Sequence, residues 1–260
     1  MTDPADGLVV LAMYPFDSVR DALDRLWPLI RQHLGFGPDA LAWDVDLHSS
    51  WQRPDLLLGQ TCGWPLVSQL GESVEVIGVF DAVVPEARDG TYRSVLVSSS
   101  PAPLDVQLAN ADLRLAVNND DSLSGYVSLR TVCAQHGRRV NAPIFTGAHL
   151  ASVRSIASAQ ADLASVDAVS WALICQSEPD LVEGLHVVGH GPRVPCLPLI
   201  CAAGSISPDG RPLADQLRHA VAAACREPAA MDLLTSMLAR GFVAKSAADY
   251  APLRRLAGAL

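Results

Sequence analysis

The stretch LRLAVNNDDSLSGYVSLR, residues 113–130, decides the fold class. Its apolar beginning, 113–117, is typical of a buried strand, and from Ser124 onward apolar residues recur at helical spacing. A polar loop joins the two parts. Similar strand–loop–helix units follow one another along the chain without an internal repeat. The sequence therefore predicts an α/β fold with mostly parallel strands.

Outward from this stretch, strand and helix patterns alternate. We predict strands at 8–13, 42–47, 55–59, 74–84, 93–97, 113–117, 163–166, 185–190 and 199–203, with an extended segment at 140–145. We predict helices from a cap at Asp17 or Ser18 to Gly35, and at 63–70, 124–136, 148–159, 167–176, 213–226, 229–240 and 249–257. Pro28 should kink or break the first helix, and Pro192, Pro195 and Pro198 should mark an irregular connection.

Two breaks in the pattern, at 98–101 and 196–198, divide the chain into two lobes. Residues 1–98 together with 199–260 would form the first lobe, which carries both termini. Residues 99–198 would form a second, inserted lobe. Two lobes joined by two connections make a cleft, which is the usual place for a small-molecule site.

The composition excludes several classes of protein. Half of the 260 residues are apolar, 18% are charged and the formal net charge is −9. This apolar content is too high for a disordered chain, and no stretch reaches the ~20 apolar residues of a membrane helix. The acidic balance argues against nucleic acid or an anionic membrane as partner. A small anion stays compatible, since a local cluster of N–H donors can bind it.

Six cysteines, at 62, 133, 175, 196, 201 and 225, contain no C-x-x-C pair and lie mostly among apolar residues. We expect buried free thiols, and leave open whether Cys196 and Cys201 lie close together. Metal-site spacings and the G-x-G-x-x-G fingerprint are absent, so we predict neither a metal nor a cofactor. The beginning, MTDPAD, lacks the basic start of a secretory leader. We expect a cytoplasmic protein if Met1 is the true start, and a periplasmic one if a leader is missing from this sequence.

The helix start at Ser122, Ser124 and Gly125 has the features of an anion site. The first N–H groups of a helix lack internal partners, and the helix dipole adds positive potential there. The two hydroxyls add donors, and a glycine lets an oxyanion approach the backbone closely. The alternative is ordinary N-capping, because Ser, Asp and Asn commonly begin helices.

Further polar residues follow other predicted strands. Thr146, Gly147 and His149 begin one helix, and Asp167 begins another, where it would be an N-cap or would accept hydrogen bonds from a ligand. Tyr14 and the Gln60–Thr61 pair follow strands of the first lobe, at the strand ends where α/β folds bind ligands.

Ser124, His149 and Asp167 supply the residue types of a catalytic triad. A nucleophile elbow requires G-x-S-x-G, whereas Ser124 is flanked by Ser122 and Tyr126 at the glycine positions. We therefore predict no catalytic residue and no enzyme.

Taken together, the segments LLLGQTCGWPL (56–66), DDSLSGY (120–126), TGAHLASVR (146–154), AD (161–162) and VD (166–167) resemble one family. It is that of the phosphate/phosphonate-binding proteins of ABC transporters. They belong to the periplasmic-binding-protein type II superfamily, with the sulfonate-binding proteins and transferrin. The resemblance covers roughly residues 8–255, and the two Ser/Thr/Gly segments are specific in combination.

The resemblance implies two Rossmann-like α/β lobes that close on a small anionic or zwitterionic oxyanion ligand and present it to an ABC permease. The residues that it implies as ligand contacts are Tyr14, Gln60, Thr61, Tyr92, Ser122, Ser124, Gly125, Tyr126, Thr146, Gly147, His149 and Asp167. Asp120 and Asp121 would repel a dianion unless they point away, so the ligand need not be a phosphonate. Two alternatives stay open, a cytoplasmic enzyme and a ligand sensor on the same fold.

Overall fold

The computed structural model describes residues 7–258, so the MTDPAD segment at 1–6 lies outside the described residues. Contacts divide the chain into two units. Unit 1 extends to Val83 and adds Arg88–Gly90 and Pro195–Ala251, whereas unit 2 contains Val84–Ala87, Thr91–Val194 and the residues from Pro252. Residues 91–98, which we expected in the first lobe, pair with the sheet of unit 2. No helix in the described part of the chain is long and apolar enough to span a membrane.

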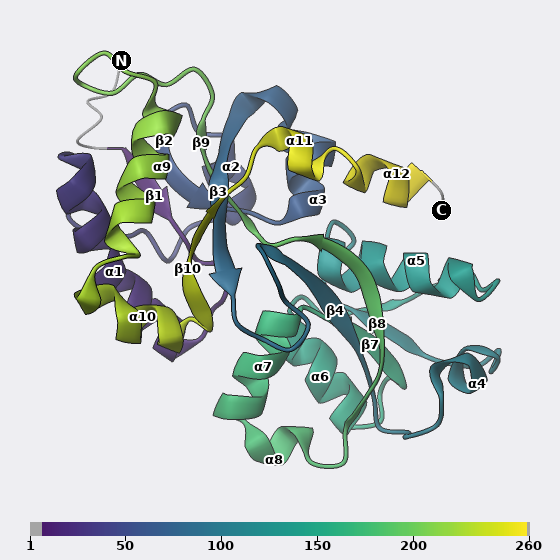
Figure 1. The fold of residues 1–260 in the computed structure, drawn as a ribbon. Coiled ribbons are helices and arrows are strands. Elements are labelled where there is room, and N and C mark those ends of the chain that lie inside the picture. Colours follow the sequence, from purple (N-terminus) through teal and green to yellow (C-terminus); the bar gives the residue numbers. More distant parts are fainter. Residues whose placement is uncertain (1–6, 259–260) are drawn as a thin grey trace. The chain divides into compact units, whose positions relative to one another are not determined.

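Unit 1 contains a five-stranded mixed sheet (Figure 1). Its strands, in spatial order, are β1 (Leu8–Val10), β2 (Leu56–Gln60), β9 (Pro198–Ala202), β3 (Val74–Ala82) and β10 (Ala239–Ala244). Only β1 and β2 are parallel; the remaining neighbours are antiparallel. The prediction of mostly parallel strands is wrong for this unit.

Long helix α1 (Asp17–Leu34) packs on α9 (Leu213–Ala224) and α10 (Met231–Ser236) through a buried stripe that includes Leu23, Leu26 and Ile30. The helix runs through Pro28 without a break, and Gly35 ends it in the left-handed region at φ 85°. Phe16, rather than Asp17 or Ser18, is the N-cap residue. The unit is completed by α2 (Leu47–Trp51), α3 (Gly63–Pro65), α11 (Ala247–Tyr250) and the short turns η2 (Leu66–Leu70), η3 (Gly71–Ser73) and η5 (Pro228–Ala230).

Unit 2 contains a second five-stranded sheet, in the order β6 (Ile144–Phe145), β5 (Leu115–Val117), β7 (Leu163–Val166), β4 (Thr91–Ser98) and β8 (His186–Pro195). Strands β6, β5 and β7 are parallel, and β4 is antiparallel to β7. Its helices are α4 (Leu104–Leu108), η4 (Leu123–Val127), α5 (Ser128–Gln135), α6 (His149–Ala157), α7 (Ala168–Ser177), α8 (Pro179–Val182) and α12 (Leu253–Gly258).

Helices cover both faces of this sheet. Leu129 and Val132 of α5 pack on one face against Val117, Leu163 and Leu96. Successive strand residues point to opposite faces, so the residues next to these face the other side, where α6 and α7 contact the strands. The small residues Ala116 and Ala164 there are fully buried, which lets the helices approach closely.

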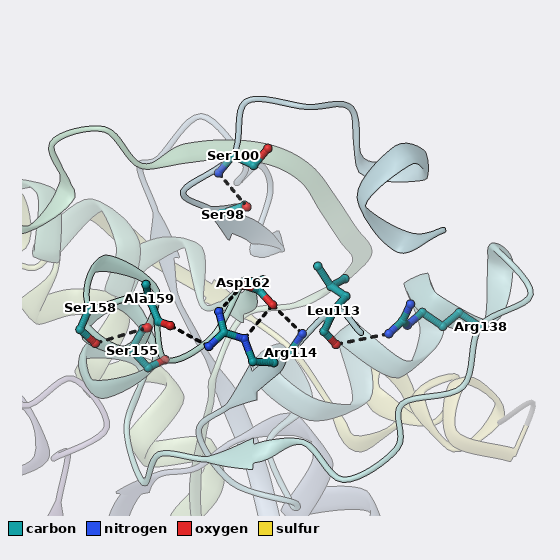
Figure 2. Close-up of polar contacts among 9 residues, drawn as sticks. All are labelled: Ser98, Ser100, Leu113, Arg114, Arg138, Ser155, Ser158, Ala159 and Asp162. Carbon is teal, nitrogen blue, oxygen red and sulfur yellow. Dashed lines mark hydrogen bonds and ion pairs between the residues drawn. The ribbon is translucent and has the colours of Figure 1, made fainter. Parts of the chain in front are cut away.

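Arg114 ties the amino ends of β5 and β7 together, and Arg138 holds the segment that leads into β5 (Figure 2). Arg114 binds Asp162 through its Nε and Nη2 atoms at 3.0 and 2.6 Å, and its Nη1 donates to the Ala159 carbonyl at 2.7 Å. Arg138 donates to four backbone carbonyls of the segment between α4 and β5, those of Leu108, Asn110, Ala111 and Leu113. These bonds fix the register of the parallel strands at one edge, and therefore the positions of the loops at the other.

The structure corrects three local predictions. Residues 42–47 form no strand, because Asp46 accepts from the Ser49 amide and begins α2. The helix predicted over 229–240 ends early, since Leu238 takes a positive φ of 52° and the chain continues as β10. The predicted irregular connection is regular through Pro192 and Pro195, because β8 is an edge strand, where proline costs no ladder hydrogen bond.

The prediction for the cysteines is confirmed. All six are free thiols, and all except the half-buried Cys175 are buried. Cys196 and Cys201 are therefore not joined by a disulfide.

Candidate functional site

Three polar loops meet at one edge of the unit 2 sheet. Because β6, β5 and β7 are parallel, the loops that follow Phe145, Val117 and Val166 all leave from the same edge. The antiparallel register of β4, with Val95 opposite Val166, places the amino end of β4 and its buried Tyr92 at this edge as well. We expected Tyr92 on the side of the first lobe; it belongs to unit 2.

The loop after β5 leads directly into a π-helical turn, η4. Ser122 is its N-cap residue, and the Ser122 Oγ accepts from the Gly125 amide at 3.0 Å. The amides of Tyr126 and Val127 both donate to the Ser122 carbonyl, at 3.1 and 3.0 Å. The N-capping role, which the sequence left open, is therefore filled by Ser122. Ser124 is the second residue of η4.

A hydrogen bond from the neighbouring strand β7 holds the backbone of Ser124 in place. Ser165, on β7, donates its hydroxyl to the Ser124 carbonyl at 2.6 Å. Both serines are buried. The Ser124 carbonyl is therefore bonded to β7, while the Ser124 side chain meets the neighbouring loop. No periodic pattern in the sequence singled out Ser165.

The loop after β6 is tied to the loop after β5. The Gly147 amide donates to the Asn118 carbonyl at 2.9 Å, and the Thr146 amide donates to the Val117 carbonyl at 2.9 Å. The Thr146 hydroxyl lies 2.7 Å from the Oγ of buried Ser152. Gly147 has a φ of 84°, a left-handed conformation that glycine adopts without strain.

These ties bring Ser124 and His149 together. The Ser124 Oγ lies 2.9 Å from the His149 Nε2. Burial lowers the pKa of His149 below its ordinary value of 6.5, because the charged imidazolium loses hydration, and the Asp167 carboxylate acts in the opposite direction. The imidazole is therefore neutral at neutral pH, and it carries one N–H.

The three residues do not form a catalytic triad. The Nδ1 of His149 is shielded from solvent and has no hydrogen-bond partner among the described residues. Asp167 is the N-cap residue of α7, and its Oδ1 accepts from the Ser170 amide at 2.9 Å. A catalytic base needs an acid that orients its second nitrogen, and this arrangement lacks that bond.

Asn118 is a site residue that the sequence reasoning missed. A Cβ added to Gly125 would lie 1.9 Å from the Asn118 Oδ1, so this oxygen rests directly against the Gly125 backbone. The same Oδ1 is shielded from solvent and has no hydrogen-bond partner within residues 7–258. Asn118 therefore lies between Gly125 and Gly147 and contacts both. Its position directly after a buried strand was the available signal.

Tyr126 lies at the margin of this cluster. Its ring packs at the edge of the α5 core, with its centroid 6.2 Å from that of exposed Phe145. The Arg130 guanidinium lies over the Tyr126 ring, 5.3 Å from the centroid. The side chain therefore has a structural role in addition to the ligand contact that the sequence predicts.

The residues expected from the first lobe form a separate group in unit 1. Gln60 and Thr61 are buried at the carboxyl end of β2, and half-buried Tyr14 follows the parallel strand β1. The Gln60 carbonyl accepts from the Trp51 Nε1 at 2.9 Å, and the Thr61 amide donates to the Pro198 carbonyl at 3.0 Å. Tyr14, Gln60 and Thr61 thus share the carboxyl edge of the only parallel pair in that sheet.

Both groups lack basic side chains. The site segments 118–126, 146–149 and 60–64 contain neither Lys nor Arg, and they contain the carboxylates of exposed Asp120 and half-buried Asp121. Within the described residues, no cluster of three or more His, Cys, Asp or Glu side chains could hold a metal ion. The donors that these segments could offer to an anion are therefore neutral N–H and O–H groups.

Solved structures of binding proteins share this fold. PhnD1 from Prochlorococcus marinus, solved with methylphosphonate, is 15% identical, with a TM-score of 0.82 over 98% of this chain and 97% of that one. The binding-protein component of an ABC phosphonate transporter from Pseudomonas aeruginosa is 17% identical, with a TM-score of 0.76 over 96% and 86%. A Xanthomonas citri protein solved with ATP is 17% identical, with a TM-score of 0.67 over 98% and 97%. No curated protein sequence matches the chain.

These likenesses confirm the periplasmic-binding-protein type II fold that the sequence predicts. The family model for the periplasmic substrate-binding protein of phosphonate ABC transporters matches residues 63–250, which include both polar loops, η4 and β10. Members of that family are transport components rather than enzymes. The chain belongs to the family of periplasmic phosphonate-binding proteins of ABC transporters.

Proposed function

We propose that this protein binds a small phosphorus oxyanion, of the phosphonate or phosphate class, in the periplasm and presents it to an ABC permease. The observation that carries the proposal is the Ser124–His149 pair, held at 2.9 Å where three polar loops meet at one sheet edge. Family membership makes a substrate-binding role the starting point, and the neutral donors at this edge suit an oxyanion.

In unit 2, the Ser122, Ser124, Gly125 and Tyr126 segment would hold the oxyanion at the start of η4. The turn continues directly into α5, so the potential of a longer helix favours negative charge at this end. Thr146, Gly147 and His149 would contact the oxyanion from the second loop. None of these groups needs a counter-charge, because backbone and hydroxyl donors act through oriented dipoles.

The remaining expected contacts would bind the rest of the ligand. Asp167, buried at the start of α7, would accept hydrogen bonds from a ligand amine or hydroxyl. Tyr14, Gln60 and Thr61 from unit 1, and Tyr92 from β4, would add further contacts to the ligand.

The experiment is thermal unfolding against single anions: methylphosphonate, 2-aminoethylphosphonate, phosphate, phosphite and sulfate. A ligand present at about a hundred times its dissociation constant stabilises the folded state by ~2.7 kcal/mol, which appears as a clear rise in Tm. We expect this rise with at least one phosphorus oxyanion. No rise with any of them would contradict the proposal.

Variants locate the site. Ser124→Ala and His149→Ala should abolish most of the rise. The matched controls are Ser158→Ala, at the exposed end of α6, and His219→Ala, on the exposed side of α9. These controls should keep the full rise; an equal loss in the controls would mean that the effect is not specific to the proposed site.

A further inference from the structure

Ser165 places a hydroxyl group within an apolar layer of unit 2. On the face of the sheet that packs against α5, its neighbours are Leu163, two residues earlier on β7, and Leu96, directly opposite on β4. Both leucines belong to the hydrophobic core of the unit, and Ser165 itself is fully buried. A buried hydroxyl costs free energy unless it is hydrogen-bonded, so the 2.6 Å bond to the Ser124 carbonyl compensates for its burial.

This bond fixes the peptide group that joins Ser124 to Gly125. The carbonyl oxygen of the group accepts from the Ser165 hydroxyl, and the amide of the group donates to the Ser122 Oγ at 3.0 Å. Because a peptide group is planar, a hydrogen bond at each end sets its orientation. The direction of the Ser124 side chain follows from that orientation, and its Oγ lies 2.9 Å from the His149 Nε2.

The pair of Ser124 and His149 is thus anchored on two neighbouring strands. β7, which carries Ser165, lies between β5 and β4 in the sheet. The loop that carries His149 is tied to the end of β5 by the Thr146 and Gly147 amides. A binding site needs its contacting groups held to within about 0.5 Å by supporting bonds, and strands provide more precise supports than loops do. The bond from Ser165 gives Ser124 such a support.

We propose that Ser165 is a positioning residue of the ligand site. Its hydroxyl holds the Ser124 carbonyl, so that the Ser124 Oγ stays beside His149, where it would bind an oxyanion. This inference rests on the proposed function and deepens it. Ser165 touches no ligand itself, because its hydroxyl is buried and donates its proton to Ser124. Loss of the bond should therefore weaken binding through Ser124.

The first measurement needs no ligand. The imidazole ¹⁵N signals of His149 in the free protein report the hydrogen bond between its Nε2 and the Ser124 Oγ. Ser124→Ala deletes this hydroxyl and gives the reference position of the Nε2 signal. Ser165→Ala should move the Nε2 signal clearly toward that reference. An Nε2 signal that stays at its wild-type position in Ser165→Ala would overturn the positioning role.

Isothermal titration calorimetry with methylphosphonate measures the effect on binding. Ser165→Ala should weaken affinity about tenfold, because a contacting group that is slightly misplaced loses much of its strength. Ser165→Cys nearly keeps the side-chain volume but replaces the hydroxyl by a weakly donating thiol, so it should weaken binding by a similar factor. Wild-type affinity in Ser165→Cys would mean that packing matters rather than the hydrogen bond, and it would overturn the assignment.

Thr131→Val is the matched control. It removes another buried hydroxyl of unit 2, which donates to the Val127 carbonyl at 2.8 Å, and it keeps the shape of the side chain. The control should leave the His149 signals unchanged and methylphosphonate affinity within about twofold of wild type. Equal losses of affinity in Thr131→Val and Ser165→Ala would show a general loosening of the unit and would contradict a specific role for Ser165.

The outcomes separate this inference from the proposed function. If the wild type binds methylphosphonate and both Ser165 variants bind it equally well, the inference fails and the proposed function stands. If the wild type binds neither methylphosphonate nor phosphate, the proposed function fails and the ligand role of Ser165 fails with it. The His149 signals then still decide whether Ser165 positions Ser124. If Ser165→Ala does not fold, the same two measurements on Ser165→Cys decide the matter.

Discussion

The two ends of the parallel strands in unit 2 are built in opposite ways. At the amino ends, Arg114 pairs with Asp162, and Arg138 donates to four carbonyls. At the carboxyl ends, serine, threonine, glycine and a neutral histidine meet, and the Asn118 Oδ1 and His149 Nδ1 have no hydrogen-bond partner among the described residues. The comparison teaches that charged side chains hold the strands at one end, whereas neutral polar side chains gather at the other end, where we propose that the ligand binds.

The largest effect should come from Gly125→Ala, at the carboxyl end. The new Cβ would lie 1.9 Å from the Asn118 Oδ1, so the start of η4 and Asn118 must move apart. Overpacking of this kind costs roughly 1–3 kcal/mol of folding free energy. Methylphosphonate affinity should fall by about 10²-fold because both oxyanion loops shift. Urea unfolding and calorimetry measure the two quantities.

Gly147→Ala is the matched comparison for this variant. A Cβ at Gly147 meets no atom within 4 Å, but the φ of 84° strains any residue with a side chain. The expected cost is about 1 kcal/mol of stability, with a smaller loss of affinity than in Gly125→Ala. A larger loss of affinity in Gly147→Ala would show that close packing by Asn118 is not what limits the site.

Arg138→Met tests the amino end. The variant removes all the bonds from the guanidinium to the segment between α4 and β5, and should cost about 1.5–3 kcal/mol in urea unfolding. Ligand affinity should stay within about twofold of wild type, because the remaining ties, including that between Arg114 and Asp162, keep the register. A tenfold loss of affinity would contradict the claim that the amino ends of the strands contribute to stability without affecting the binding site.

The two ends should also respond at different pH values. The pKa of His149 is lowered from 6.5 by burial, so the unfolded chain binds more protons than the folded one as the pH falls below 6.5, and stability is lost there. The pKa of Asp162 is lowered from 3.8, first by the hydrogen bond from Arg114, so its contribution is present above 3.8 and is lost only as the pH falls through the lowered value.

Urea unfolding across the acidic range would resolve the two steps. His149→Gln should remove the loss that begins near 6.5 and leave the more acidic one, and Asp162→Asn should do the reverse. The effect is the smallest of the set, because Arg114 and Asp162 lie at the surface, where solvent screens them. Identical pH profiles for wild type and His149→Gln would contradict the lowered pKa of His149.

Patterns local to the sequence predicted much of the molecule. The strand–loop–helix unit at 113–130, the left-handed stop at Gly35 and the helix start at Asp167 all depend on short-range chemistry, and the structure confirms them. The strand β10 was missed because it depends on pairing with β3, some 160 positions earlier in the chain, for which 239–244 gives no clear alternation. Pro192 and Pro195 could likewise be placed in a strand only once β8 was known to be the outermost strand of its sheet.

The candidate site was predictable to a similar depth. Serine, threonine and glycine at helix starts pointed to Ser124 and His149, and the structure brings these two together. Ser165 had no sequence signal, because its role arises from a contact with Ser124, 41 residues earlier in the chain. Asn118 had only its position directly after a buried strand. That the named residues contact a ligand stays a prediction, which the calorimetric comparison tests.

The burial of the cysteines affects how their thiols would react in an oxidising compartment. Burial raises the pKa of Cys133 to about 11 and those of Cys201 and Cys225 to about 12. The thiolate is the species that attacks disulfides, and at neutral pH these thiols supply almost none of it. In a family that works in the periplasm, where disulfides form and persist, burial protects these thiols from exchange. Unfolding would expose the five buried thiols to exchange, so oxidation would act mainly on misfolded copies and spare native ones.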